Sequence, residues 1–271
     1  MLSKHLIANI VRWLAALVVV LAVAAVAVYL SERPLVTPQN LIQSLADAKT
    51  PSPQQKVLVF SPHPDDETIA VGGYIANARM RGDAVRIVLI TNGNRHHQET
   101  MRYSEFRQAT SILGVDKSDL VFLGFPDGQL RKLDPSVLTK AFREQIDSYN
   151  PDFIIYPHIR DAHPDHYTAG RIIEAIVAAG ISNKPTTYQY LVHFQFFYPQ
   201  PYKYAPDLYL SPPISLVTDN FEWLKFLLSP SIEDLKRRAI YSYRSQINDP
   251  LLRGLIFSSI RKNELLAASS P

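Results

Sequence analysis

The chain has 271 residues, 46% of them hydrophobic, and its 28 basic and 25 acidic residues leave a formal charge of +3. This length allows one large domain with a substantial core, and so balanced a charge argues against nucleic acid as a partner. The absence of cysteine excludes disulfides, thiolate nucleophiles and cysteine-ligated zinc sites. Any metal must therefore be held by histidine and carboxylate ligands.

The most hydrophobic stretch runs from Trp13 to Leu30, eighteen residues without a charged side chain. At about 1.5 Å per residue, a helix of this length nearly crosses the hydrocarbon core of a bilayer. We therefore interpret residues 1–12 as a short tail and 13–30 as a transmembrane anchor. A cleaved signal peptide and a buried soluble helix are the alternatives. The positive charges of Lys4 and Arg12 favour a cytoplasmic N-terminus and an extracytoplasmic domain.

Residues 31–54 separate the anchor from the rest of the chain. They are predicted to be a linker because they contain four prolines around one short helix, predicted at 39–49. The catalytic domain is then expected to span residues 55–271.

Short apolar strands alternate with helices in the first part of this domain. Strands are predicted at 57–60, 84–91, 120–123 and 152–156, and helices at 67–81, 99–113, 135–149 and 165–179. This alternation predicts an α/β, Rossmann-like fold, with a mostly parallel sheet flanked by helices. Beyond residue 184 we predict a strand at 188–197, a proline- and tyrosine-rich segment at 198–213, and closing helices at 232–243 and 251–266.

Two short segments concentrate metal-binding side chains, His63-Pro64-Asp65-Asp66-Glu67 and His163-Pro164-Asp165-His166. Each follows a predicted strand, and the carboxyl ends of parallel strands meet at one edge of a sheet. Imidazole and carboxylate are ligands that Zn²⁺ takes, and a catalytic site uses three of them and leaves one position for water. The two segments therefore predict a metal hydrolase. If they share one ion, the imidazoles of His63 and His166 must lie within about 8 Å of each other.

The residue types also suggest which side chains bind the metal and which transfer protons or stabilise an oxyanion. Adjacent carboxylates point in different directions, so one of Asp65 and Asp66 can bind metal while the other takes a proton from water. Alternatively, Asp66 caps the following helix and Asp65 lies on the surface. Of the two histidines in the second segment, one can complete the ligand set and the other can stabilise an oxyanion, with Asp165 orienting one of them.

With further motifs, the chain resembles the PIG-L/LmbE-like family of zinc-dependent N-acetylglucosamine deacetylases over roughly residues 56–266. These motifs are Thr91-Asn92-Gly93, Arg102-x-x-Glu105 with Ala109 and Leu113-Gly114, Phe125-Pro126-Asp127-Gly128, and Tyr243-Arg244-Ser245-Gln246. The resemblance implies that Zn²⁺, or another divalent metal such as Fe²⁺, is held by His63, Asp66 and His166.

The same resemblance implies the remaining roles. Asp65 is the general base, and His163 stabilises the oxyanion or acts as an acid. Asp165 sets the orientation or basicity of His163. Arg102 and Asp127 reach sugar hydroxyls or a phosphate, although for Arg102 a surface ion pair with Glu105 is an alternative.

The chain departs from part of the family at Asp161, where some members carry a tyrosine that contacts the reaction intermediate. Four further histidines match no expected ligand, and a structural or surface role is predicted for His96, His97, His158 and His193. The segment 198–209 is expected to be either a carbohydrate-stacking lid or a packed aromatic loop.

The implied activity is metal-dependent removal of the acetyl group from an N-acetylglucosamine-type sugar. The predicted anchor favours a glycolipid or an envelope glycan as the substrate, and a soluble acetylated sugar is the alternative. Two other functions are considered: a hydrolase of another amide or ester, and a membrane-tethered glycan-binding protein with an inactive metal site. Asp65 argues against the second, because metal binding alone needs no additional carboxylate.

Overall fold

The computed structural model describes residues 4–94, 97–195, 197–217 and 220–269, and it divides into two units after Arg33. The first unit contains helix α1 (Lys4–Glu32). Within α1, His5–Ser31 form a 27-residue span with a mean hydropathy of 2.7, none of it buried against protein. The span includes the predicted anchor and is long and apolar enough to cross a membrane, although a signal sequence has the same character.

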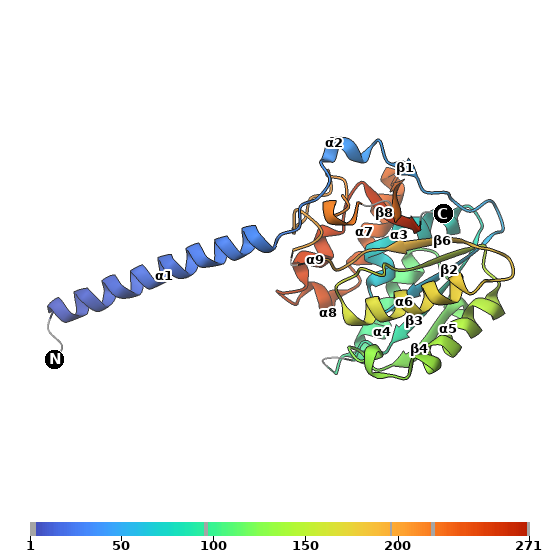
Figure 1. The fold of residues 1–271 in the computed structure, drawn as a ribbon, viewed down its shortest axis with the longest axis horizontal. Coiled ribbons are helices and arrows are strands. Elements are labelled where there is room, and N and C mark those ends of the chain that lie inside the picture. Colours follow the sequence, from blue (N-terminus) through green and yellow to red (C-terminus); the bar gives the residue numbers. More distant parts are fainter. Residues whose placement is uncertain (1–3, 95–96, 196, 218–219, 270–271) are drawn as a thin grey trace. The chain divides into compact units, whose positions relative to one another are not determined.

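The second unit is built on a sheet that has eight strands in the described residues, in the order β1-β7-β8-β6-β5-β2-β3-β4 (Figure 1). Its neighbouring strands are parallel except where β8 pairs with β6 and β7. The predicted mostly parallel α/β fold is thus confirmed. The strands are β1 (Ala46–Asp47), β2 (Lys56–Ser61), β3 (Ala84–Thr91), β4 (Leu120–Phe125), β5 (Phe153–Pro157), β6 (Thr186–Tyr190), β7 (Phe221–Leu227) and β8 (Asn263–Ser269).

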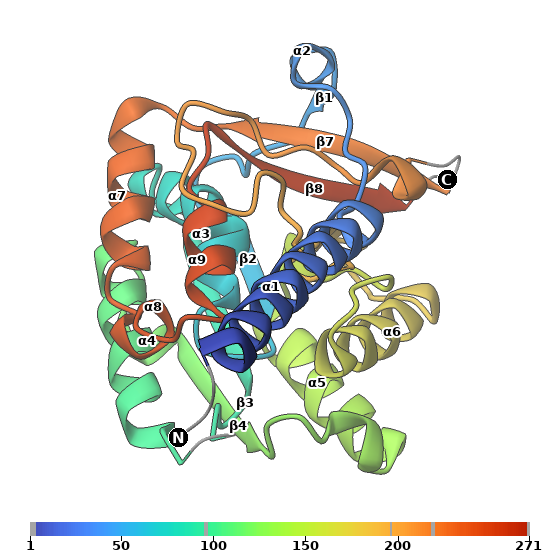
Figure 2. The same ribbon diagram turned by 90° about the vertical axis from the view of Figure 1, so that its left-hand side faces the viewer.

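Helices cover both faces of the sheet (Figure 2). Side chains of α3, α4 and α7 pack in one core cluster with Val57 and Val59, and those of α5 and α6 pack in another with Leu58 and Phe60. Successive side chains of a strand point to opposite faces, so an uninterrupted apolar run supplies both cores. The helices beyond α1 are α2 (Gln39–Ile42), α3 (Asp66–Met80), α4 (Glu99–Ile112), α5 (Pro135–Tyr149), α6 (Pro164–Ala178), α7 (Pro230–Ile240), α8 (Arg244–Ile247) and α9 (Arg253–Ser258), with short 3-10 turns at Lys117–Asp119, Leu130–Lys132 and Ile214–Leu216.

The strand order reverses direction beside β2. From β2 the chain adds β3 and β4 on one side, and then returns to place β5 and β6 on the other. Ligands of open α/β sheets bind in the crevice outside the carboxyl ends of the strands at such a reversal. The loops after β2 and β5, which carry the two histidine motifs, therefore flank one crevice.

The segment predicted to be a linker contributes to the folded unit. Residues from Pro34 onward belong to the compact unit, Ile42 of α2 is fully buried, and β1 pairs in parallel with β7. The compact unit therefore starts about twenty residues before the predicted boundary at 55.

The C-terminal region also differs from the prediction. The helix expected at 251–266 is limited to α9, and the chain then forms β8, which pairs along its length with β7, a strand that was not predicted. Residues 263–269 contain Glu, Leu and Ala, which favour helix, but Leu265 and Leu266 are buried in a strand between β7 and β6. Tertiary pairing overrides local propensity here.

Candidate metal and catalytic site

The first motif lies in a tight turn between β2 and α3. Both the backbone N–H and the hydroxyl of Thr91 donate to the carbonyl of Pro62, at 3.0 and 2.7 Å. Gly93 has a φ of +61°, and a Cβ there would lie 2.9 Å from the ring of Pro64. Only glycine fits this close approach, so the Thr-Asn-Gly motif positions the turn that carries the first histidine motif.

Asp65 has an unusual backbone conformation, with a φ of 136° and a ψ of −29°. Residues other than glycine rarely occupy this region, and such strain persists only where the surroundings enforce it. The carboxylate of Glu67 accepts hydrogen bonds from the Asp65 N–H and from the hydroxyls of Ser61, Thr68 and Tyr243. This fully buried network holds the turn in place.

The second motif forms the N-terminus of α6. His163 is the N-cap residue, and its Nδ1 accepts a hydrogen bond of 3.2 Å from the backbone N–H of Asp165. Because Nδ1 is an acceptor, the ring carries its proton on Nε2 when it is neutral. Burial and the nearby rings of His63 and His166 lower the pKa of His163 to about 3, so the neutral form dominates.

Three atoms from the two motifs face one another at the crevice. The Nδ1 of His63 lies 3.1 Å from the Oδ2 of Asp66 and 3.2 Å from the Nε2 of His166. The remaining side of the triangle, from Asp66 Oδ2 to His166 Nε2, is 3.0 Å. Tetrahedral Zn²⁺ with bonds of about 2.0 Å separates its ligands by about 3.3 Å, so this donor set fits the ion. The ring centroids of His63 and His166 are 5.2 Å apart, within the predicted limit.

The outer nitrogens of the same two histidines contact carboxylates. His63 Nε2 lies 3.1 Å from Asp165 Oδ2 and 3.4 Å from Asp127 Oδ1. His166 Nδ1 lies 3.2 Å from Asp161 Oδ2, an ion-pair contact without regular hydrogen-bond alignment. A proton held on each outer nitrogen leaves the inner lone pair available, which is the usual arrangement of metal-binding histidines.

The position of Asp165 corrects one expectation. Its carboxylate contacts His63 and not His163, and it also accepts hydrogen bonds from the backbone N–H groups of Gly128 (2.7 Å) and Leu130 (3.0 Å). Only its backbone N–H reaches His163. Gly128 of the motif Pro126-Asp127-Gly128 thus helps to fix Asp165, and Asp165 in turn contacts His63.

Asp65 lies beside this triangle, next to Arg102. Burial raises the pKa of Asp65 to about 7, and the positive charge of Arg102 opposes that rise. The guanidinium lies 3.2 Å from Asp65 Oδ2 and 3.6 Å from Asp127 Oδ2, and it donates to the carbonyl of Pro64 at 2.9 Å. Arg102 is only 8% exposed, and Glu105 accepts hydrogen bonds from Ser245. The alternative of a surface Arg102–Glu105 ion pair is therefore wrong.

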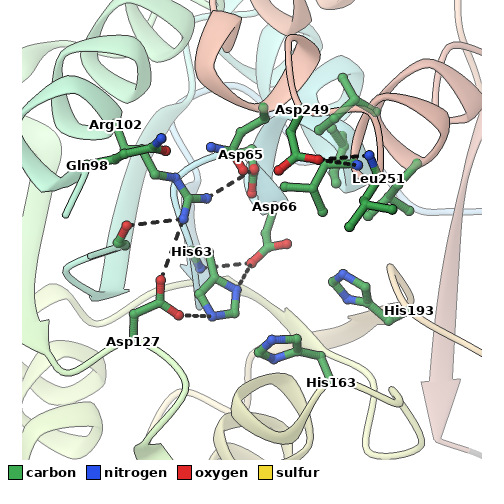
Figure 3. Close-up of a pocket in the computed structure, with 16 residues that line it drawn as sticks. His63, Asp65, Asp66, Gln98, Arg102, Asp127, His163, His193, Asp249 and Leu251 are labelled. Carbon is green, nitrogen blue, oxygen red and sulfur yellow. Dashed lines mark hydrogen bonds and ion pairs between the residues drawn. The ribbon is translucent and has the colours of Figure 1, made fainter. Parts of the chain in front are cut away.

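These groups line a cavity of about 320 Å³, a volume suited to a small ligand (Figure 3). The polar part of its wall includes His63, Asp65, Asp66, His163, Arg102 and Asp127. Leu251, Leu252, Leu255 and Ile256 add an apolar part to the wall. The cavity therefore presents two chemically different surfaces to a ligand.

Two residues of the site were not assigned from sequence. Asp161 is 4% exposed and contacts His166 of the triangle, although the sequence showed it only as a departure from tyrosine. His193 lines the cavity near His163. The signal for both was their place beside the carboxyl ends of β5 and β6.

His158 and the tyrosine-rich segment do not contribute to the triangle. His158 is buried and stacks on Trp223, as expected of a structural residue, and His96 falls outside the described residues. In the tyrosine-rich segment Tyr198 is buried, and the buried guanidinium of Arg261 donates to the carbonyls of residues 201, 203 and 205. This segment is a packed loop.

The fold and the paired motifs define an α/β protein with a histidine–carboxylate site at a sheet reversal. Residues 58–177 match the family model described as PIG-L: GlcNAc-PI de-N-acetylase. Two similar proteins are both named "Probable N-acetyl-alpha-D-glucosaminyl L-malate deacetylase 2". The one from Bacillus anthracis is 30% identical over 50% of this chain and 65% of its own length. The one from Bacillus cereus is 32% identical over 52% of this chain and 67% of its own length. The chain therefore belongs to the PIG-L family.

Two further similarities extend the comparison. Diacetylchitobiose deacetylase of Thermococcus kodakarensis is 32% identical over 48% of this chain and 52% of its own length. The structure of N,N'-diacetylchitobiose deacetylase from Pyrococcus horikoshii matches with a TM-score of 0.53 and 22% identity, over 73% of each chain. The chain thus spans about half to two thirds of the length of the curated relatives it matches.

Proposed function

We propose that this chain is a zinc-dependent deacetylase that removes the acetyl group from an N-acetylglucosamine-type sugar. The relatives named above are deacetylases of such sugars, which supports the substrate class. The observation that carries the proposal is the triangle of His63, Asp66 and His166, with sides of 3.0–3.2 Å, beside the strained Asp65 in a cavity of ligand size.

The chain's own residues would divide the reaction as follows. A zinc ion held by the triangle would supply Lewis-acid polarisation of the amide carbonyl and of a water molecule. Asp65, whose pKa lies near 7, would take a proton from that water as it attacks the carbonyl carbon. His163 would donate a hydrogen bond from Nε2–H to the carbonyl oxygen as negative charge develops there. Asp65 would then return its proton to the departing amine, and acetate and the free amino sugar would result.

The surrounding residues would position these groups. Asp165 would hold the ring of His63, and Arg102 would hold the carboxylate of Asp65. Arg102 and Asp127 also reach the cavity wall, where we propose that they contact sugar hydroxyls.

The substitution Asp65→Asn tests the assignment of the base. We expect the variant to retain zinc, because Asp65 is outside the triangle, and to lose acetate release by about 10² to 10⁴-fold. Metal analysis and acetate release from a panel of N-acetylhexosamine derivatives measure both quantities. Asp134→Asn, which converts an exposed carboxylate at the N-cap of α5 into an amide that can still cap the helix, is the matched control and should change neither. Unchanged acetate release in Asp65→Asn would remove Asp65 as the base.

The panel also separates the alternatives. A wild-type chain that binds zinc and the sugars but releases no acetate would be a glycan-binding protein. Release of another acyl group from an unrelated amide or ester, without sugar deacetylation, would identify the other kind of hydrolase.

We further propose that α1 anchors the enzyme in a membrane with the catalytic domain on the extracytoplasmic side, where it acts on a glycolipid or an envelope glycan. The hydropathy of His5–Ser31 supports the anchor. Protease added to intact cells should then digest the domain. Digestion only after lysis would place the domain on the cytoplasmic side, and release of the domain into the medium would identify a cleaved signal.

A further inference from the structure

His193 occupies a position in the cavity that the proposed chemistry does not use. It follows β6, and its backbone is fixed to the loop that carries the second motif. Its N–H donates to Asp161 Oδ2 at 3.0 Å, and its carbonyl accepts from the N–H of Ala162 at 2.8 Å. Its ring centroid lies 4.7 Å from that of His166 and 5.2 Å from that of His163. The ring is therefore held beside the reacting centre.

The two nitrogens of the His193 ring have different surroundings. Nδ1 is buried and lies 3.5 Å from Asp161 Oδ1, with no hydrogen-bond partner among the described residues. The side chain is nevertheless 28% exposed, and it lines the cavity. The exposed edge is consequently the one that includes Nε2. A carboxylate facing Nδ1 favours the tautomer with the proton on that atom, and this leaves an acceptor lone pair on Nε2.

Asp161 connects this ring to the metal triangle. One of its oxygens contacts His166 Nδ1 and the other faces His193 Nδ1, while the backbone N–H groups of His163, Val192 and His193 fix the carboxylate. A single buried carboxylate thereby sets the positions of a metal-facing imidazole and a cavity-facing one.

We infer that His193 is a substrate-binding residue whose Nε2 accepts a hydrogen bond from a hydroxyl of the bound sugar, close to the acetamido group. The inference rests on the proposed function, because it assumes a sugar in the cavity. His163 would then present a donor, and His193 an acceptor, from adjacent positions on one wall. Such a pair favours a ligand with an acetamido group and a hydroxyl on neighbouring carbons, as a 2-acetamido sugar has.

Two near-isosteric substitutions separate this role from a structural one. Glutamine at position 193 places an amide near the location of Nε2, whereas asparagine places it near Nδ1. We expect His193→Gln to retain most of kcat/KM for methyl N-acetylglucosaminide. His193→Asn and His193→Phe should lose about tenfold with an unchanged zinc content, since one hydrogen bond to the substrate is removed. A purely structural role, exerted through Asp161, predicts the opposite order for glutamine and asparagine and would overturn the inference.

Monodeoxy analogues of the same glycoside identify the partner hydroxyl. In the wild type, one analogue should lose about tenfold or more in kcat/KM, and in His193→Phe that analogue should lose nothing further. Equal penalties in both proteins for every analogue would contradict the contact.

A spectroscopic measurement gives a readout that does not depend on turnover. In zinc-loaded Asp65→Asn, the ¹⁵N resonances of His193 should show a protonated Nδ1, and the Nε2 resonance should shift when the glycoside is added. If wild type releases acetate but this resonance does not move, the inference fails while the proposed function stands. If wild type releases no acetate from any sugar, the proposed function and the inference fail together.

Discussion

The substitution Asp165→Asn should weaken zinc binding through the orientation of His63. The Asp165 side chain is fully buried and faces three donors: His63 Nε2 and the N–H of Gly128 at one oxygen, and the N–H of Leu130 at the other. An amide has only one acceptor oxygen. If that oxygen faces His63, the N–H of Leu130 meets an NH₂ group and loses its partner. If the amide is reversed, His63 can accept from it only by moving its own proton to Nδ1, where the metal needs a lone pair.

The magnitude follows from these two orientations. Loss of a buried partner costs about 1–3 kcal/mol of folding free energy. Substitution of a carboxylate that supports a metal-binding histidine typically lowers metal affinity by about 10 to 100-fold, which is about 1.4–2.7 kcal/mol. Competition with a chelating dye measures the zinc dissociation constant, and denaturant unfolding of the metal-free chain measures the folding term.

The control for this experiment is again Asp134→Asn. Its carboxylate lies on the surface and accepts hydrogen bonds only from Ser136 among the described residues, so zinc affinity should be unchanged. If Asp165→Asn bound zinc as tightly as the wild type, the argument that Asp165 fixes the tautomer of His63 would be refuted.

Three further predictions follow from the same structure. Gly93→Ala should lower the unfolding free energy by about 1–3 kcal/mol and reduce acetate release, because alanine would have to adopt a left-handed φ and its Cβ would meet the ring of Pro64. Denaturant titration measures this loss, and an unchanged unfolding midpoint would contradict the prediction. Tyr243→Phe should destabilise the chain by about 1.5–3 kcal/mol, because the buried carboxylate of Glu67 loses a donor, and calorimetry against the wild type tests this. A chelator should lower the melting temperature of the zinc-loaded chain by several degrees, since free zinc at one hundred times its dissociation constant contributes about 2.7 kcal/mol. Asp66→Ala, which lacks a ligand, should show no such shift.

The sequence is most informative where local pattern and tertiary environment agree. Continuous apolar strands such as 57–60 occur because both faces of the sheet are covered, so their pattern predicted parallel pairing. The convergence of His63 and His166 followed from that pairing, since His63 follows β2 and His166 follows β5, and these two strands are parallel neighbours whose carboxyl ends lie at the same edge. The short edge strand β1 and the antiparallel strand β8 both depend on pairing with β7, far away in the sequence, and no local pattern marks them.

The same reasoning explains why His193 was predicted to have a structural or surface role. The predicted strand at 188–197 ran through it, which would have placed His193 inside the sheet. In the structure β6 ends at Tyr190, so His193 lies in a loop at the edge where the two motifs meet. The error of a few residues in one strand end thus hid a residue of the cavity. Asp161 was recognised as unusual, but its contact with His166 depends on how the loop folds back.

The backbone of Asp65 has a consequence for how this protein can change. Glycine adopts a φ of 136° without penalty, so Asp65→Gly should relieve about 1–3 kcal/mol of conformational energy while it eliminates the proposed base. Backbone conformation and the proposed reaction therefore favour different residues at position 65. Under the proposed role of Asp65 as the base, selection for turnover would retain an aspartate here against the conformational energy that glycine would relieve.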